Sequence, residues 1–151
     1  MTSLREHFRA ADIHLAVEGT TKTAILAELV AGLGLGNEES SIILKILERR
    51  ELVGSTGVGH GVAIPHCRTH LVPRLRVVLA RKPGGVDWGA VDGLPVTRIF
   101  LLVAPPVEVS NEYLPVLGRI ARLMNSSDIR ERLDATATPE EVLQLLDEPS
   151  A

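Results

Sequence analysis

The segment VTRIFLLVA, Val96–Ala104, constrains the fold more than any other part of the chain. It is a nearly continuous run of β-branched, aliphatic and aromatic side chains, and this composition is typical of a strand buried on both faces. Such a strand needs a layer of structure over each side of its sheet. Because aromatic residues make up only 3% of the 151 residues, Leu, Val, Ile and Ala must supply most of both layers.

Predicted strands and helices are interspersed along the chain. Besides the segment above, the apolar patterns predict strands at Asp12–Val17 and Leu75–Ala80. The helices are predicted after Thr20-Thr21, from Asn37 to about Arg50, from Ser110 or Asn111 to about Met124, from Ser126 or Ser127 to Leu133, and from Thr138 to about Asp147. This order favours an α/β fold, and the length favours one domain spanning residues 1–151.

Composition excludes several classes of function. The net charge is −3, so the chain lacks the basic character of a nucleic-acid-binding protein. No apolar run approaches the roughly 20 residues that a membrane-spanning helix needs, and no direct membrane insertion is expected. A single cysteine, Cys67, permits no internal disulfide. Together with an amino terminus that lacks the apolar core of a signal peptide, these features predict a cytoplasmic protein.

The stretch GSTGVGHGVAIPH, Gly54–His66, is the most unusual part of the sequence. Four glycines fall within eight positions of it, more than one turn requires. This density allows backbone N–H groups to approach and surround an anion. The spacing from Gly54 to Gly59 matches the start of a nucleotide-binding P-loop, but His60 and Gly61 stand where that motif needs Lys and Ser or Thr. A P-loop is therefore not predicted.

A zinc site is a second interpretation of the same region. His60, His66, Cys67 and His70 are potential ligands, and the spacings His66-x3-His70 and Cys67-x2-His70 suit zinc. No carboxylate or second cysteine nearby completes the set, and Pro65 disfavours a helical pair of histidines. We therefore expect no metal, and we expect His70 and Cys67 to be ordinary structural residues.

A phosphohistidine is the interpretation that explains most of the stretch. A neutral imidazole is a good nucleophile near neutral pH, so His66 is a candidate phosphoryl acceptor. Phosphoryl transfer chiefly needs position and positive charge. Arg49 and Arg50 precede the glycines and can supply that charge, since a guanidinium binds two phosphoryl oxygens at once. Ser55 and Thr56 add hydroxyl groups beside the glycines.

These residues resemble a known family. GSTGVGHGVAIPH is similar to the active-site signature of the mannitol/fructose-type enzyme IIA domains of the bacterial phosphotransferase system, a class that includes nitrogen-related regulatory IIA proteins. The resemblance extends over nearly the whole chain, to the segment TPEEVLQLLD. It implies a central mixed β-sheet with helices on both faces, and it implies no cofactor. It also implies that His66 accepts a phosphoryl group from an HPr-like phosphocarrier protein and passes it to a IIB domain or holds it as a signal to a regulatory target protein.

The resemblance also assigns roles to individual residues. The family's active-site arginine closes the helix before the signature, and in the context ERRELVGSTG it matches Arg50. Many members carry a second histidine at the start of a later helix, and Tyr113 occupies that position here. A tyrosine donates one hydrogen bond but carries no positive charge, so the phosphorylated state is expected to lack one stabilising cation. The residues expected to contact the phosphoryl group are Ser55, Thr56, Gly57, Gly59, His60 and Gly61.

Two functional hypotheses follow. The first is a stand-alone phosphocarrier of the enzyme IIA type, with His66 as nucleophile and Arg50 as charge stabiliser. The second is a non-catalytic regulatory protein-binding module of the same fold, in which phosphorylation of His66 is slow or absent. Tyr113 favours the second hypothesis, whereas the presence of His66, Arg50 and the glycine-rich loop together favours the first.

Overall fold

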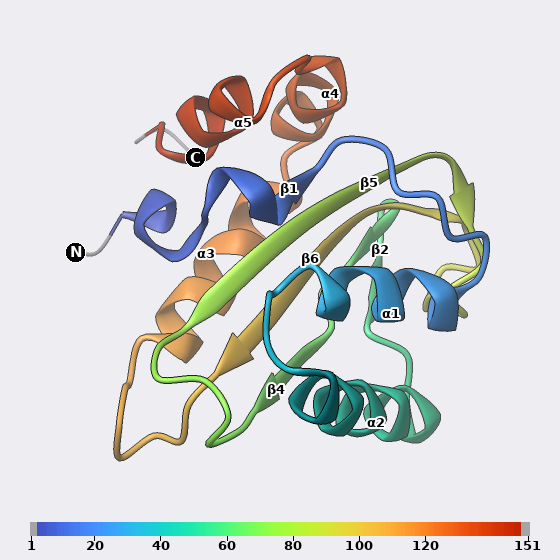
Figure 1. Cartoon of the computed structure of the whole chain (residues 1–151). Helices are drawn as coiled ribbons and strands as arrows, with labels where there is room; N and C mark the ends of the chain where they lie inside the picture. Colours follow the sequence, from blue (N-terminus) through green and yellow to red (C-terminus); the bar gives the residue numbers. More distant parts are fainter. Residues whose placement is uncertain (1–2, 149–151) are drawn as a thin grey trace.

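A computed structural model describes residues 3–148 of the chain, and within them it shows a six-stranded mixed sheet (Figure 1). The strands lie in the order β1-β5-β6-β3-β2, and β4 also pairs with β6. Their bounds are β1 Ile13–His14, β2 Gly57–Gly59, β3 Val62–Ala63, β4 His66–Arg68, β5 Arg76–Val86 and β6 Val96–Ala104. The pairs β1–β5, β3–β6 and β4–β6 are parallel, whereas β5–β6 and β2–β3 are antiparallel.

Helices cover both faces of this sheet, as the resemblance implies (Figure 1). On one face lie α1 and α2, and on the other lie α3, α4 and α5 together with the short 3₁₀-helix η1. Their bounds are η1 Leu4–His7, η2 Ala10–Asp12, α1 Lys22–Ala31, α2 Asn37–Val53, α3 Tyr113–Met124, α4 Ser127–Ala135 and α5 Pro139–Leu146. None of the helices within residues 3–148 is both long and apolar enough to cross a membrane.

The strand β6 lies at the centre of the molecule and confirms the prediction made for Val96–Ala104. Its side chains alternate between the two layers: Phe100 and Leu102 pack with α3 and α5, whereas Leu101 and Val103 pack with α1 and α2. All four of these side chains are fully buried. This alternation is the physical reason that the sequence shows an unbroken apolar run rather than alternating polar and apolar residues.

The glycine-rich stretch contains three short strands that the sequence did not predict. After β2 turns back into β3, the chain passes through Ile64 and Pro65 and enters β4. Both β3 and β4 run parallel to β6, one after the other, with Ala63 opposite Ile99 and His66 opposite Leu102. The candidate nucleophile is thus held on a strand rather than in a free loop.

Some element boundaries differ from the predictions. The strand predicted at 12–17 contains only Ile13–His14, because η2 occupies the residues before it. The predicted α3 cap at Ser110 or Asn111 is wrong: Glu112 is the N-cap, and Pro115 therefore lies in the first turn, where a helix tolerates proline. The predicted caps Thr21, Ser126 and Thr138 each accept a backbone N–H hydrogen bond, as expected.

Candidate functional site

His66 begins β4, and its ring lies on the α3 face of the sheet. The next residue, Cys67, points to the opposite layer, as the alternation of a strand requires. His66 is half-buried, and its Nδ1 atom lies 2.7 Å from the backbone oxygen of Ile64. A carbonyl oxygen can only accept a hydrogen bond, so Nδ1 is the protonated nitrogen. The remaining ring nitrogen, Nε2, therefore carries the free lone pair.

Tyr113 packs beside the His66 ring. Its ring centroid lies 5.8 Å from that of His66, and the two planes are tilted by 48°. Tyr113 is the first residue of α3, and it is 8% exposed. Burial raises the pKa of its phenol, and the positive charges of Arg68 and Arg50 only partly oppose that rise. The phenol is therefore neutral and protonated at physiological pH.

Arg68 adds a second arginine to this region, one that the sequence reasoning missed. It lies two residues beyond His66 on β4, so both side chains are on the same face of the strand. Its guanidinium carbon is 4.4 Å from the centre of the Tyr113 ring, and its Nη1 atom donates a hydrogen bond to the Pro105 oxygen at 3.1 Å. The spacing His66-x-Arg68 could have revealed this neighbour only if residues 66–68 had been predicted as a strand.

Arg50 lies in the last turn of α2, close to this cluster. Its side chain is exposed, and its Nη1 atom donates a hydrogen bond to the Gly54 oxygen at 2.5 Å. The structure thus joins Arg50 to the first glycine of the loop, and its charge acts on the phenol of Tyr113. His66, Tyr113 and Arg50, which lie far apart in the sequence, are brought to one region.

Ser55, Thr56 and Gly57 lie between α2 and the sheet, and hydrogen bonds within the protein fix them. The Ser55 hydroxyl donates to the Trp88 oxygen at 2.9 Å and accepts the Gly57 N–H at 3.0 Å. The buried Thr56 hydroxyl donates to the Glu51 carboxylate and accepts from the Trp88 indole. A Cβ on Gly57 would lie 2.7 Å from the Ala90 Cβ, so close packing requires glycine there. These groups hold the loop in place.

The structure does not bring Gly59, His60 and Gly61 together with His66. They form the tip of the β2–β3 hairpin, where both glycines have positive φ angles and the His60 N–H donates to Asp92. Val62, next to this tip, pairs with Arg98, whereas His66 pairs with Leu102. Four residues along β6 correspond to about 13 Å. The expectation that these three residues contact a phosphoryl group on His66 gains no support from this placement.

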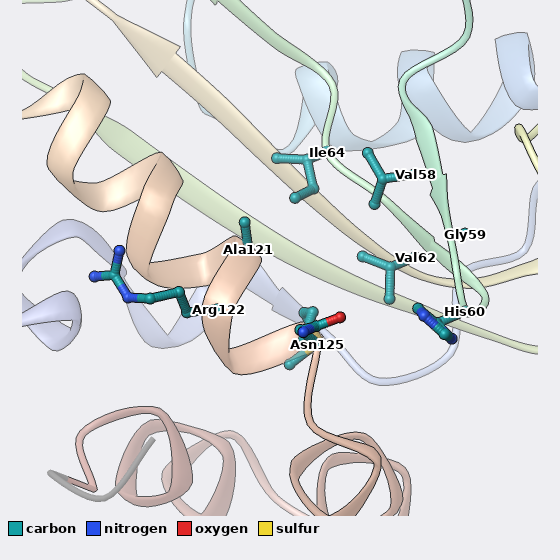
Figure 2. Close-up of a pocket in the computed structure, with 9 residues that line it drawn as sticks. Val58, Gly59, His60, Val62, Ile64, Ala121, Arg122 and Asn125 are labelled. Carbon is teal, nitrogen blue, oxygen red and sulfur yellow. The ribbon is translucent and has the colours of Figure 1, made fainter.

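His60 instead borders a cavity of about 340 Å³ between the hairpin and the carboxyl-terminal half of α3. Figure 2 shows the side chains of Val58, Val62 and Ile64 gathered around this space, with α3 opposite them. His66 is not among the lining residues. The cavity is therefore separate from the candidate nucleophile.

The residues considered for zinc do not converge. Within residues 3–148, no group of three or more histidine, cysteine, aspartate or glutamate side chains could hold a metal ion. Cys67 is buried, and burial raises the pKa of its thiol to about 12, whereas His70 is exposed. Cys67 also faces the layer opposite to the His66 ring.

Comparison with known proteins identifies the class to which this fold and site belong. A sequence model of the family described as "Phosphoenolpyruvate-dependent sugar phosphotransferase system, EIIA 2" matches residues 6–148. The chain belongs to this family, and the resemblance seen in the sequence is confirmed.

Relatives within the family include regulatory proteins. The chain is 34% identical over 137 residues to a nitrogen regulatory protein of Bradyrhizobium diazoefficiens, covering 90% of this chain and 89% of the relative. The crystal structure of the nitrogen regulatory protein IIA-Ntr from Neisseria meningitidis matches with a TM-score of 0.80 and 31% identity, covering 95% and 98% of the two chains.

The same fold occurs in the complex of enzyme IIA mannitol and phosphorylated enzyme IIB mannitol from Escherichia coli. That chain matches with a TM-score of 0.71 and 24% identity, covering 92% of this chain and 97% of that one. At this level of identity the match establishes the shared fold alone.

Proposed function

We propose that this protein is a phosphohistidine carrier in which His66 accepts a phosphoryl group on Nε2. The observation that supports the proposal most directly is the 2.7 Å hydrogen bond from Nδ1 to the Ile64 oxygen. This bond fixes the tautomer, so the lone pair of a neutral imidazole resides on Nε2. A half-buried ring on a strand also holds the nucleophile in one position, which phosphoryl transfer requires.

The transfer step balances without a cofactor. The Nε2 lone pair of His66 forms a bond to phosphorus as the phosphorus–nitrogen bond of a donor phosphohistidine breaks. The breaking electron pair returns to the donor ring, which leaves as a neutral imidazole. The His66 ring keeps its Nδ1 proton and gains the positive charge that the donor ring loses. The Ile64 oxygen stabilises that charge, because a hydrogen bond from a cationic donor is stronger than one from a neutral donor.

In this proposal Arg50 supplies charge to the phosphoryl oxygens. A guanidinium has five N–H donors, and the bond to the Gly54 oxygen uses only one of them. Its exposed position at the end of α2 allows it to approach an incoming group. Ser55, Thr56 and Gly57 hold the loop that carries Gly54, and through it they position Arg50. Gly59, His60 and Gly61 have no part in the proposed site.

The proposed partners follow from the family. The donor would be an HPr-like phosphocarrier protein. The acceptor would be a IIB domain, a pairing supported by the IIA–IIB mannitol complex of the same fold. The relatives named as nitrogen regulatory proteins favour a regulatory target protein as the alternative reader of the phosphorylated state. We propose the cytoplasm as the place of this exchange, where a single unpaired cysteine is stable.

Phosphoryl transfer in solution tests the proposal. The protein is mixed with enzyme I, HPr and phosphoenolpyruvate, and its intact mass is followed for wild type, His66→Ala and the control His70→Ala. We expect one acid-labile phosphoryl group on wild type and on His70→Ala, and none on His66→Ala. His70 is a suitable control because it is an exposed histidine four residues away.

The opposite result would favour the second hypothesis. If wild type binds HPr-type proteins but several such donors leave its mass unchanged, the carrier function is refuted. The protein would then be a regulatory binding module that has kept the fold.

A further inference from the structure

The arrangement of Arg68, Tyr113 and His66 carries an inference beyond the transfer step itself. A phosphoryl group on Nε2 carries about two negative charges near neutral pH. Arg50 offsets one of them. The sequence suggested that the second cation is missing, because Tyr113 cannot be charged. The structure shows a different cation, Arg68, on the same face of β4 as His66.

Two contacts hold the Arg68 guanidinium in a defined place. Its carbon lies 4.4 Å from the centre of the Tyr113 ring, within the range of a cation–π interaction. Its Nη1 atom donates to the Pro105 oxygen at 3.1 Å, and Pro105 directly follows the end of β6. The stack and this hydrogen bond leave the other N–H donors of the guanidinium for a further ligand.

Tyr113 lies beside both partners. Its ring centroid is 5.8 Å from the His66 ring, and the Arg68 guanidinium rests on the same phenol ring. The side chain is buried and belongs to the first turn of α3, so its ring is a rigid surface. Because the phenol is neutral, it adds no negative charge that would repel a phosphoryl group.

We propose that Arg68 is a second phosphoryl-binding arginine and that Tyr113 is the residue that positions it. The inference rests on the proposed function of His66. In the phosphorylated state, free N–H donors of Arg68 bind phosphoryl oxygens while the guanidinium remains stacked on Tyr113. The aromatic ring and the arginine on β4 thus together supply the cation that the tyrosine alone lacks. The guanidinium suits this role because its planar face stacks while its edge donates.

The equilibrium between donor and acceptor gives the sharpest test. Phosphorylated HPr is mixed with an equal amount of this protein, and the phosphoryl group is quantified on each protein by intact mass. Loss of one charge-assisted interaction should shift this partition toward HPr by about tenfold for Arg68→Gln. The control Arg74→Gln removes an exposed arginine outside the site and should leave the partition unchanged.

Variants of Tyr113 separate positioning from simple packing. Tyr113→Phe keeps the ring and should behave nearly as wild type, whereas Tyr113→Leu removes the stacking surface and should shift the partition as Arg68→Gln does. The double variant Tyr113→Leu/Arg68→Gln should shift it no further than either single variant, because the two residues act as one unit. Arg68→Lys, which keeps the charge, should partly restore the partition relative to Arg68→Gln. Thermal unfolding of each variant verifies that it is folded.

The outcomes distinguish this inference from the proposed function. If wild type is phosphorylated on His66 and Arg68→Gln, folded, shows the wild-type partition, the role of Arg68 is refuted and the carrier function stands. Additive shifts for Arg68 and Tyr113 would refute the positioning role of the tyrosine. If wild type accepts no phosphoryl group from any HPr-type donor, both the carrier function and the inference fall.

Discussion

Glu51 and Thr56 are joined by two hydrogen bonds across the end of α2. The Glu51 carboxylate accepts the backbone N–H of Thr56 at 3.0 Å, and it also accepts the Thr56 hydroxyl. Lys22 lies 2.9 Å from the same carboxylate, and the Trp88 indole donates to the Thr56 hydroxyl at 3.1 Å. The loop that begins at Gly54 is therefore attached to α1, to α2 and to the core tryptophan.

This relationship predicts the effect of Thr56→Val. The substitution keeps the shape of the side chain but removes the hydroxyl, so the buried Trp88 indole N–H loses its acceptor. We expect the free energy of unfolding to fall by about 2 kcal/mol, the usual cost of an unsatisfied buried group. Denaturant unfolding measures it, and Thr23→Val, at an exposed position of α1, should change stability by about 0.5 kcal/mol or less. Equal effects of the two substitutions would contradict the prediction.

Arg50 and Arg49 offer a matched pair for the charge in the proposed transfer. Both are exposed in the last turns of α2, but Arg50 bonds to Gly54 and its charge acts on Tyr113. We expect Arg50→Ala to slow phosphorylation of His66 by about tenfold to a hundredfold, because it removes a charge that stabilises the transition state. Arg49→Ala should change the rate little. Time courses of intact mass give both rates, and similar rates for the two variants would remove the proposed role of Arg50.

Asp12 predicts how stability depends on pH. The carboxyl is fully buried, and that burial tends to raise its pKa, but hydrogen bonds from Arg9 and the charge of Arg76 lower the pKa overall. Because the folded-state pKa lies below the unfolded value of about 3.9, the stabilisation is present above that pH and is lost as pH falls through the folded-state pKa.

Asp12→Asn should remove this stabilisation. At pH 7 we expect a loss of about 3 kcal/mol, since two arginines lose their buried counter-ion. The difference from wild type should shrink as the pH falls below about 4. Unfolding curves at a series of pH values provide the measurement, with the exposed Asp128→Asn as control. A difference that stays constant down to pH 2 would show that ionised Asp12 is not the source.

Cys67 predicts the reactivity of the thiol beside the proposed nucleophile. Burial raises its pKa to about 12, so at pH 8 only about one thiol in ten thousand is ionised. We expect iodoacetamide to modify the native protein very slowly at pH 8 and to modify it rapidly in denaturant. Mass spectrometry follows both reactions. Rapid alkylation of the native protein would show that Cys67 is accessible, contrary to its burial in the layer of α1 and α2.

Several parts of the fold could be predicted from local patterns. The bounds of β6 match the apolar run Val96–Ala104 because burial on both faces leaves a clear mark in the sequence. The helix starts at Thr21 and Thr138 were predicted because a capping hydroxyl acts within its own turn. The cap of α3 was not found, since Glu112 makes no side-chain capping hydrogen bond.

The short strands could not be predicted in the same way. The strands β2, β3 and β4 contain two or three residues each, which is too few to show a periodic pattern. Their pairing with β6 depends on hydrogen bonds between segments more than 30 residues apart. The density of glycines predicted an anion-binding loop. In the structure Gly57 allows close packing against Ala90, and the glycines at 59 and 61 form a tight turn.

The sequence by itself determined the α/β class, the family, and the residues His66, Arg50 and Tyr113 as candidates, because these depend on local periodicity and on a specific motif. Only the tertiary structure decided which nitrogen of His66 is free, that Arg68 stacks on Tyr113, and that His60 lies away from the site. These facts depend on strand register and on the packing of α3 against the sheet. Both bring together residues that are distant in the chain, and no local pattern in the sequence records such contacts.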